Sequence, residues 1–207
     1  SIYTADETFL LAENDQVVVI RGWGSPHLLR PIPHVISIRV CAPFELRVKR
    51  MMERLNTADR DFVENEIRMS EEAHGAITRR HFGISWQHSD QYDLVLNTER
   101  LTIEECADEV MELLDDPNFQ ETPESQRIFR NLATAAHVRS ALRQDPRTNT
   151  MRISITSEDG LVTLAGLVDP GHEPKDAAEV ASKVSGVKGV VNKLRVAALG
   201  ARHHVEG

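Results

Sequence analysis

The order of apolar and polar residues divides the chain into two halves with different patterns. In the first half, short apolar runs at 17–20, 35–40 and 94–96 predict strands that are covered on both faces. Longer amphipathic stretches at Phe44–Leu55 and 58–80 predict helices between them. Strands that alternate with helices need crossover connections, so the fold class expected here is α/β with a parallel sheet.

The second half has the pattern of a smaller, separate domain. Residues 153–155 alternate between apolar and polar, and the turn residues Glu158, Asp159 and Gly160 follow them directly, which predicts a hairpin. The expected elements are a helix at 128–142, strands at 153–155 and Leu161–Val168, a helix at 173–184 and a last strand at 190–196. This order, α-β-β-α-β, predicts a small α+β domain.

The boundaries follow from composition. We expect a first domain at 1–115, with additional helices at 3–13 and 102–114. A polar segment with two prolines, 116–125, is the expected linker to a second domain at 126–199. The last residues, 200–207, are expected to be a disordered tail.

Charge and composition exclude several function classes. The formal net charge is −8, which argues against general binding to nucleic acid or to a membrane surface. The two cysteines, Cys41 and Cys106, lie in apolar contexts and form no disulfide framework. No apolar run has the length of a transmembrane segment, and no signal-peptide pattern is present, so we expect a cytoplasmic protein.

The arginines of the first half are the strongest candidates for chemistry. This half is acidic: residues 1–115 carry 12 basic and 21 acidic side chains. Arg47, Arg50 and Arg54 nevertheless share one face of a predicted helix, and Arg68, Arg79 and Arg80 follow on the next. Guanidinium groups gathered on two helices suit a polyphosphate, because each offers a fork of donors to phosphate oxygens.

Four sequence features of residues 3–114 resemble the cytidylate kinase-like family of P-loop nucleoside monophosphate kinases. They are the apolar run followed by Arg21-Gly22, the pattern A-P-x-E-x-R-x-x-R at 42–50, Arg79-Arg80-x-Phe-Gly, and Tyr92-Asp93-Leu94-Val95 before Asn97-Thr98. The resemblance implies a P-loop-kinase-like parallel sheet and phosphate transfer from ATP, with magnesium, to a nucleoside monophosphate. By position, Arg47, Arg50, Arg68, Arg79 and Arg80 would close a lid over the phosphates, and Arg21 would face the acceptor monophosphate.

The sequence departs from this family in the phosphate loop. No G-x-x-x-x-G-K-[ST] pattern occurs in the 207 residues, and none of the five lysines is followed by Ser or Thr. Ile20 replaces the usual glycine before the arginine, which puts the acceptor role of Arg21 in doubt. The chain begins with Ser1, so one alternative is a fragment of an active ATP-dependent kinase whose phosphate loop precedes it. As given, the chain is not expected to catalyse ordinary phosphoryl transfer.

The second half resembles a BON domain, a small bacterial module that is usually linked to binding phospholipid or other proteins. The matching segments are 160–166 (GLVTLAG) and 184–192 (VSGVKGVVN). The glycines in them build the fold: Gly160 suits a turn with positive φ, and Gly186 suits the end of a helix. The resemblance implies a partner protein as ligand, or, on weaker grounds, an anionic lipid for the scattered basic residues.

Simpler interpretations stand beside each of these signals. The arginines could form surface ion pairs with Glu53, Glu64 or Glu71, and the tryptophans, Trp23 and Trp86, could cover apolar surface rather than stack on a base. His74, His81 and His88 recur every seven residues, but no carboxylate pattern supports a metal site.

Three functional hypotheses follow. The leading one is a kinase-derived binding or regulatory protein, in which a kinase-like domain without its phosphate loop is joined to a BON interaction module. The first alternative is the kinase fragment, and the second is a scaffold in which neither half binds nucleotide. A half-sheet with an exposed edge beside 17–20 or 35–40 would also need covering, so we expect a homo-oligomer.

Overall fold

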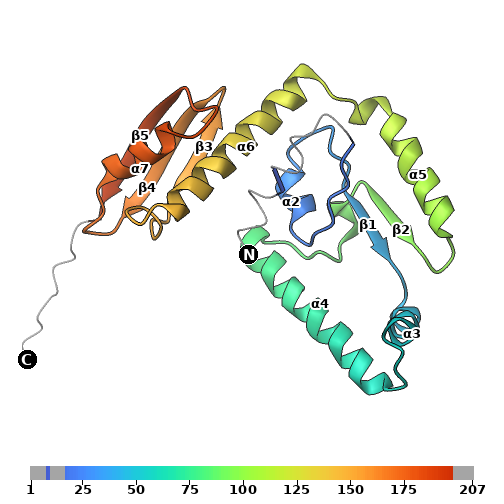
Figure 1. The fold of residues 1–207 in the computed structure, drawn as a ribbon. Helices are drawn as coiled ribbons and strands as arrows, with labels where there is room; N and C mark the ends of the chain where they lie inside the picture. Colours follow the sequence, from blue (N-terminus) through green and yellow to red (C-terminus); the bar gives the residue numbers. More distant parts are fainter. Residues whose placement is uncertain (1–7, 10–16, 198–207) are drawn as a thin grey trace, which may run out of the picture. The chain divides into compact units, whose positions relative to one another are not determined.

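The computed structural model describes residues 8–9 and 17–197, and these form a mixed α/β structure with two separate sheets (Figure 1). Contacts between Cα atoms group the chain into two compact units. The N-terminal unit is 19–125, and the C-terminal unit is 126–207 together with 1–18. Each unit is described by itself.

The N-terminal unit contains a parallel pair of strands, β1 (Ile38–Cys41) and β2 (Leu94–Asn97). Ile38 lies opposite Leu94 and Cys41 opposite Asn97, so both strands end at the same edge of the sheet. The other elements of this unit are α2 (Ser25–Leu29), α3 (Phe44–Leu55), α4 (Arg60–Phe82), η1 (Ser89–Gln91), α5 (Ile103–Asp115) and η2 (Pro117–Phe119). The parallel α/β class predicted for this half is therefore confirmed.

Local signals set the bounds of the two long helices that follow β1. Helix α3 begins after Pro43 and ends at Asn56, whose φ of 49° is left-handed. The side chain of Asp59 caps α4 by accepting a hydrogen bond from the backbone N–H of Phe62. Gly83, with φ of 69°, ends this 23-residue helix.

The predicted strand at 17–20 is wrong. The backbone at these positions is irregular, and Val17, Val18 and Val19 are 78%, 37% and 92% exposed. Within the part of the chain that the structure describes, no strand lies beside this run to accept its backbone hydrogen bonds. An apolar run forms a buried strand only where a sheet covers it, so the pattern alone gave the wrong answer here.

One further prediction differs from the structure at its end, and another lies mostly outside the described residues. Strand β1 begins at Ile38 rather than Val35. Of the expected helix at 3–13, the structure describes only Thr8 and Phe9, which are helical, and the rest lies outside the described residues.

The C-terminal unit is a three-stranded sheet with two helices, in the predicted order α-β-β-α-β (Figure 1). Its elements are α6 (Pro123–Gln144), β3 (Ser154–Glu158), β4 (Leu161–Val168), α7 (Pro174–Ser182) and β5 (Gly189–Val196). Strand β4 is central, antiparallel to β3 and parallel to β5. Helix α6 begins at Pro123, so the expected linker at 116–125 contains η2 and the first turn of a helix.

A continuous core holds this unit together. Val162, Leu164 and Val168 alternate along β4 toward the helices, and Ala177 and Ala181 of α7 pack on them. The hairpin between β3 and β4 turns through Asp159 and Gly160, both with positive φ, in the two-residue form that favours Asp-Gly. The expected tail lies outside the described residues.

Candidate phosphate-binding site

Arg47 and Arg50 of α3 reach the carboxyl ends of the two parallel strands. The Nε of Arg47 donates to the carbonyl oxygen of Ala42, directly after β1, at 3.1 Å. The guanidinium of Arg50 donates to both the hydroxyl and the carbonyl oxygen of Thr98, directly after β2, each at 2.8 Å. In open parallel sheets, ligands bind outside the carboxyl ends of the strands. The two arginines therefore lie where a ligand of this fold is expected.

Thr98 ties the ends of the two strands together at this edge. Its backbone N–H donates to the carbonyl oxygen of Cys41 at 2.9 Å, and its hydroxyl donates to the same oxygen at 3.2 Å. Arg50 is thus anchored on a rigid corner, although its side chain remains exposed. A positioned but exposed guanidinium has donors left for an anion.

Arg68 of α4 joins the same group through an aromatic ring. Its guanidinium carbon lies 4.4 Å from the ring centroid of Phe44, and that of Arg47 lies 5.6 Å from the same centroid. Both distances are in the range of cation–π contacts. The structure therefore brings Arg47 and Arg68 together around the ring of Phe44 at the beginning of α3, and Arg50 follows three residues after Arg47 on the same helix, at Thr98.

Acidic side chains already occupy part of this cluster. Arg47 forms a close, half-buried ion pair with Glu71. Arg68 lies 3.7 Å from a carboxylate oxygen of Glu64, four residues before it on α4. The surface ion pairs considered from the sequence are therefore present for Glu64 and Glu71. Since partly exposed pairs of this kind contribute about 0–1 kcal/mol, a phosphate can compete for these guanidinium groups.

The other predicted site residues lie elsewhere in the unit. Arg79 and Arg80 are near the end of α4, at least eleven residues beyond Arg68, or about 16 Å along a helix. Arg21 is exposed in the irregular segment before α2. In this conformation neither group lies with the cluster at the beginning of α3, and the sequence-based roles of these three residues stay predictions.

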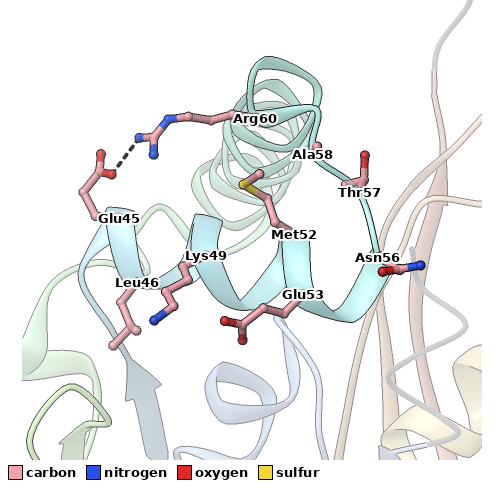
Figure 2. Close-up of a pocket in the computed structure, with 9 residues that line it drawn as sticks. All are labelled: Glu45, Leu46, Lys49, Met52, Glu53, Asn56, Thr57, Ala58 and Arg60. Carbon is pink, nitrogen blue, oxygen red and sulfur yellow. Dashed lines mark hydrogen bonds and ion pairs between the residues drawn. The ribbon is translucent and has the colours of Figure 1, made fainter.

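A groove of about 870 Å³ runs along a different face of α3 (Figure 2). Lys49 and Glu53 of α3 line it. By helical spacing Lys49 lies on the side of the helix away from Arg47, whereas Glu53, three residues after Arg50, lies next to Arg50. The remaining cation of the groove, Arg60, bonds to Glu45 and Glu64. The hydrogen bond and the charge of Glu45 are the main reason that the pKa of Arg60 is raised. With both signs of charge present and Arg60 already paired, this groove is a poorer phosphate site than the arginine cluster.

The two tryptophans pack on other side chains. Trp23 stacks on His74, with ring centroids 4.1 Å apart and planes 11° apart, and meets the edge of Trp86 at 4.9 Å. The guanidinium of Arg39 covers Trp86 at 5.1 Å. One face of Trp23 is therefore already occupied by a protein ring, which agrees with the simpler interpretation that the tryptophans cover apolar surface.

The described residues do not fit the donor side of a kinase site. A donor triphosphate needs a lysine and a row of backbone amides at the carboxyl end of the sheet. Lys49 is the sole lysine before Lys175 in the sequence, and it lies on the groove side of α3. Among the described residues, no group of three His, Cys, Asp or Glu side chains could hold a metal ion.

Sequence reasoning did not assign roles to the residues that organise the cluster. Glu71 was considered as an ion-pair partner of the arginines, but it lies one helix away from Arg47, and no local pattern predicts that these two residues meet. Phe44 was visible only as an apolar residue at the beginning of a helix. Thr98 was part of the quoted Asn97-Thr98 pair, and its position directly after a predicted strand was the one available signal for its role.

The parallel strands and the arginines beside them define the N-terminal unit as an α/β region with cationic side chains at the carboxyl ends of its strands. Residues 2–100 match the model of the cytidylate kinase-like family, and residues 132–198 match that of the BON domain. Both predicted resemblances are thereby confirmed: the chain joins a cytidylate kinase-like region to a BON domain.

A relative of the kinase-like region is named as an enzyme. The chain is 32% identical over 94 residues to a protein named cytidylate kinase from Methanothermobacter thermautotrophicus. The matched region is 45% of this chain and spans 56% of the length of that relative. No helix among the described residues is both long and apolar enough to cross a membrane.

Proposed function

We propose that this protein binds a phosphorylated nucleoside through Arg47, Arg50 and Arg68, and that its BON domain docks a partner protein. The observation that carries the proposal is the position of Arg50, which is fixed on Thr98 at the carboxyl ends of β1 and β2. The match to the cytidylate kinase-like family supports a nucleoside monophosphate as the ligand class.

Binding rather than group transfer is the function that these residues support. Arginines hold phosphate oxygens without any chemical step, whereas transfer needs a positioned donor triphosphate. The 207 residues contain no phosphate-loop pattern that would hold one. Arg47 is the least accessible member of the cluster because Glu71 and Ala42 already accept its donors. Arg50 and Arg68 are therefore the main contacts in the proposal.

Calorimetric titration of the full chain with CMP, and separately with ATP, tests this proposal. We expect saturable binding of CMP that Arg50→Ala weakens by at least tenfold, since about 1.4 kcal/mol corresponds to that factor and a charged hydrogen bond contributes that much or more. Lys49→Ala is the matched control, because it removes a cation of the same helix that lines the groove and is not part of the proposed site. No heat with either nucleotide, or equal losses in the two variants, would overturn the proposal.

An active phosphotransferase is the second candidate, and the name of the cytidylate kinase relative favours it. A coupled assay with CMP, ATP and magnesium separates the two functions. Binding without turnover is expected of the residues described above. Turnover that is retained after repeated purification and lost in Arg50→Ala would establish the enzymatic function instead.

A further inference from the structure

Helix α4 carries a stripe of exposed apolar side chains on one face, from Phe62 to Ile77. Phe62, Met69 and Ile77 are 49%, 58% and 41% exposed, and Ala73 is exposed between the last two. Their spacings of seven, four and four residues place them on one face of the helix. The side chains that α4 buries lie on the other face, at Val63, Ile67 and Thr78. Glu66 interrupts this face between Phe62 and Met69. Exposed apolar residues at these spacings are typical of a helix that packs on another helix.

Charged residues along one border of the stripe are ordered in a self-complementary way. From the beginning of the helix they are Asp61, Arg68, Glu72 and Arg79. Their charges run negative, positive, negative, positive along the helix. Taken from the other end of the helix, the charge at each position has the opposite sign. The centre of the set is residue 70, which is also close to Met69 in the middle of the stripe.

We propose that α4 pairs with α4 of a second copy of this chain, antiparallel and centred at residue 70. In this arrangement Arg68 faces Glu72 of the second copy, and Asp61 faces Arg79 of the second copy. Two-fold symmetry repeats each pair, which gives four ion pairs beside the stripe. Phe62 then lies against Ile77 of the second copy, and the two Met69 side chains meet at the centre.

The same charges disfavour a parallel pair. In a parallel pair in register, Arg68 would face Arg68 and Glu72 would face Glu72, so each charge would meet its own kind. The antiparallel order replaces every one of these repulsions with an attraction. Charge therefore selects the orientation, and the apolar stripe supplies the contact area.

Ion pairs within one chain do not account for Asp61, Glu72 and Arg79, which take part in none among the residues that the structure describes. Arg68 lies 3.7 Å from a carboxylate oxygen of Glu64 and 4.4 Å from the ring centroid of Phe44. An acidic beginning and a basic end stabilise the dipole of any helix, which is a sufficient reason for Asp61 and Arg79. That reason does not extend to Arg68 and Glu72, which lie in the middle of α4.

Sedimentation equilibrium of the full chain, at micromolar concentrations, is the first test. We expect a dimer that Met69→Glu converts to a monomer, because two carboxylates would meet at the centre of the interface. Met111→Glu is the matched control: Met111 is 59% exposed on α5, and its replacement should leave the dimer intact. A monomeric wild-type chain, or a dimer that resists Met69→Glu, would overturn the proposal.

Charge reversal tests the register. Arg68→Glu and Glu72→Arg should each weaken the dimer by at least tenfold, since each replaces two attractions with two repulsions. The double variant should restore it, because the pairs form again with the signs exchanged. Circular dichroism checks that all three variants fold. If each single variant weakens the dimer but the double variant does not restore it, the proposed antiparallel register is wrong.

Cysteine cross-linking tests the orientation independently of charge, in a background with Cys41→Ser and Cys106→Ser. Met69→Cys should form a disulfide-linked dimer on mild oxidation. Phe62→Cys should not, because its two copies would be about 24 Å apart along an antiparallel pair. Cross-linking of both variants with equal efficiency would indicate a parallel pair and contradict the proposal.

Discussion

The two units of this protein use similar elements but differ in how completely they bury them. In the C-terminal unit, three strands and two helices surround a cluster of eleven buried residues. In the N-terminal unit, the cluster between α3 and α4 contains three, Val48, Val63 and Ile67. Its sheet has two strands, and Val40 on β1 is 65% exposed. The large buried cluster of the C-terminal unit is typical of a small domain that is stable by itself.

The difference indicates where each unit carries its function. The eleven residues of the buried cluster in the C-terminal unit are apolar and build the fold, and the proposed docking role depends on the surface of this unit. The N-terminal unit presents charged and apolar groups that its own core does not use, including the arginine cluster and the stripe on α4. Exposed apolar and cationic surface of this kind is where ligands and partners bind.

The largest expected effect is a core substitution in the C-terminal unit. Leu164→Ala removes a side chain that is fully buried, and we expect it to lower the free energy of unfolding by about 2–5 kcal/mol. Differential scanning calorimetry should show a shift of one unfolding transition. Leu167→Ala, on the exposed face of the same strand, should shift it little. Equal shifts for the two variants would contradict the described packing of β4.

The next largest expected effect is the difference in stability between substitutions at two glycines, one in each unit. A Cβ at Gly160, where φ is +87°, would lie 2.6 Å from the carbonyl oxygen of Gly186. At Gly83, where φ is +69°, an added Cβ would have no neighbouring atom within 4 Å. Both substitutions to Ala cost about 1–2 kcal/mol of backbone strain, and Gly160→Ala adds a clash. Chemical denaturation should therefore show a larger loss of stability for Gly160→Ala, and the reverse order would contradict the comparison.

The smallest effect concerns pH and the C-terminal unit. Arg147 bonds to Asp145, Asp176 and Glu179, and its hydrogen bonds lower the pKa of Asp145 to about 2. A carboxyl group whose pKa is lower in the folded state stabilises the fold above its unfolded pKa and loses this contribution as the pH falls. Asp145→Asn should therefore lower the melting temperature slightly at neutral pH, with a difference that disappears near pH 2. A difference that is independent of pH would exclude this ionic contribution.

Much of the fold was predictable because its signals are local. Strand β4 was predicted with its observed ends, since apolar alternation and the Asp159-Gly160 turn both mark them. Helix α5 carries a capping box formed by Thr102 and Glu105, and the sequence had placed its start at Thr102. Helix α3 has its predicted bounds for the same kind of reason.

The errors and omissions depend on contacts that are distant in the sequence. Residues 17–20 have the composition of a buried strand, but burial requires a neighbouring strand, and the pattern cannot report whether one is present. The pairing of Arg47 with Glu71 depends on how α3 packs on α4. The helical spacing placed Arg47 and Arg50 on one face, but only the structure shows that this face reaches the ends of β1 and β2.

The most direct test of the central claim observes the arginine side chains during a titration with CMP. In nitrogen-15 NMR spectra of the full chain, we expect the Nε–H signals of Arg50 and Arg68 to shift saturably. The signal of Arg147, which lies in the C-terminal unit, should remain in place. This result would locate the phosphate at the carboxyl ends of β1 and β2. No shift at Arg50 and Arg68 at saturating CMP, or equal shifts at all three arginines, would contradict the account.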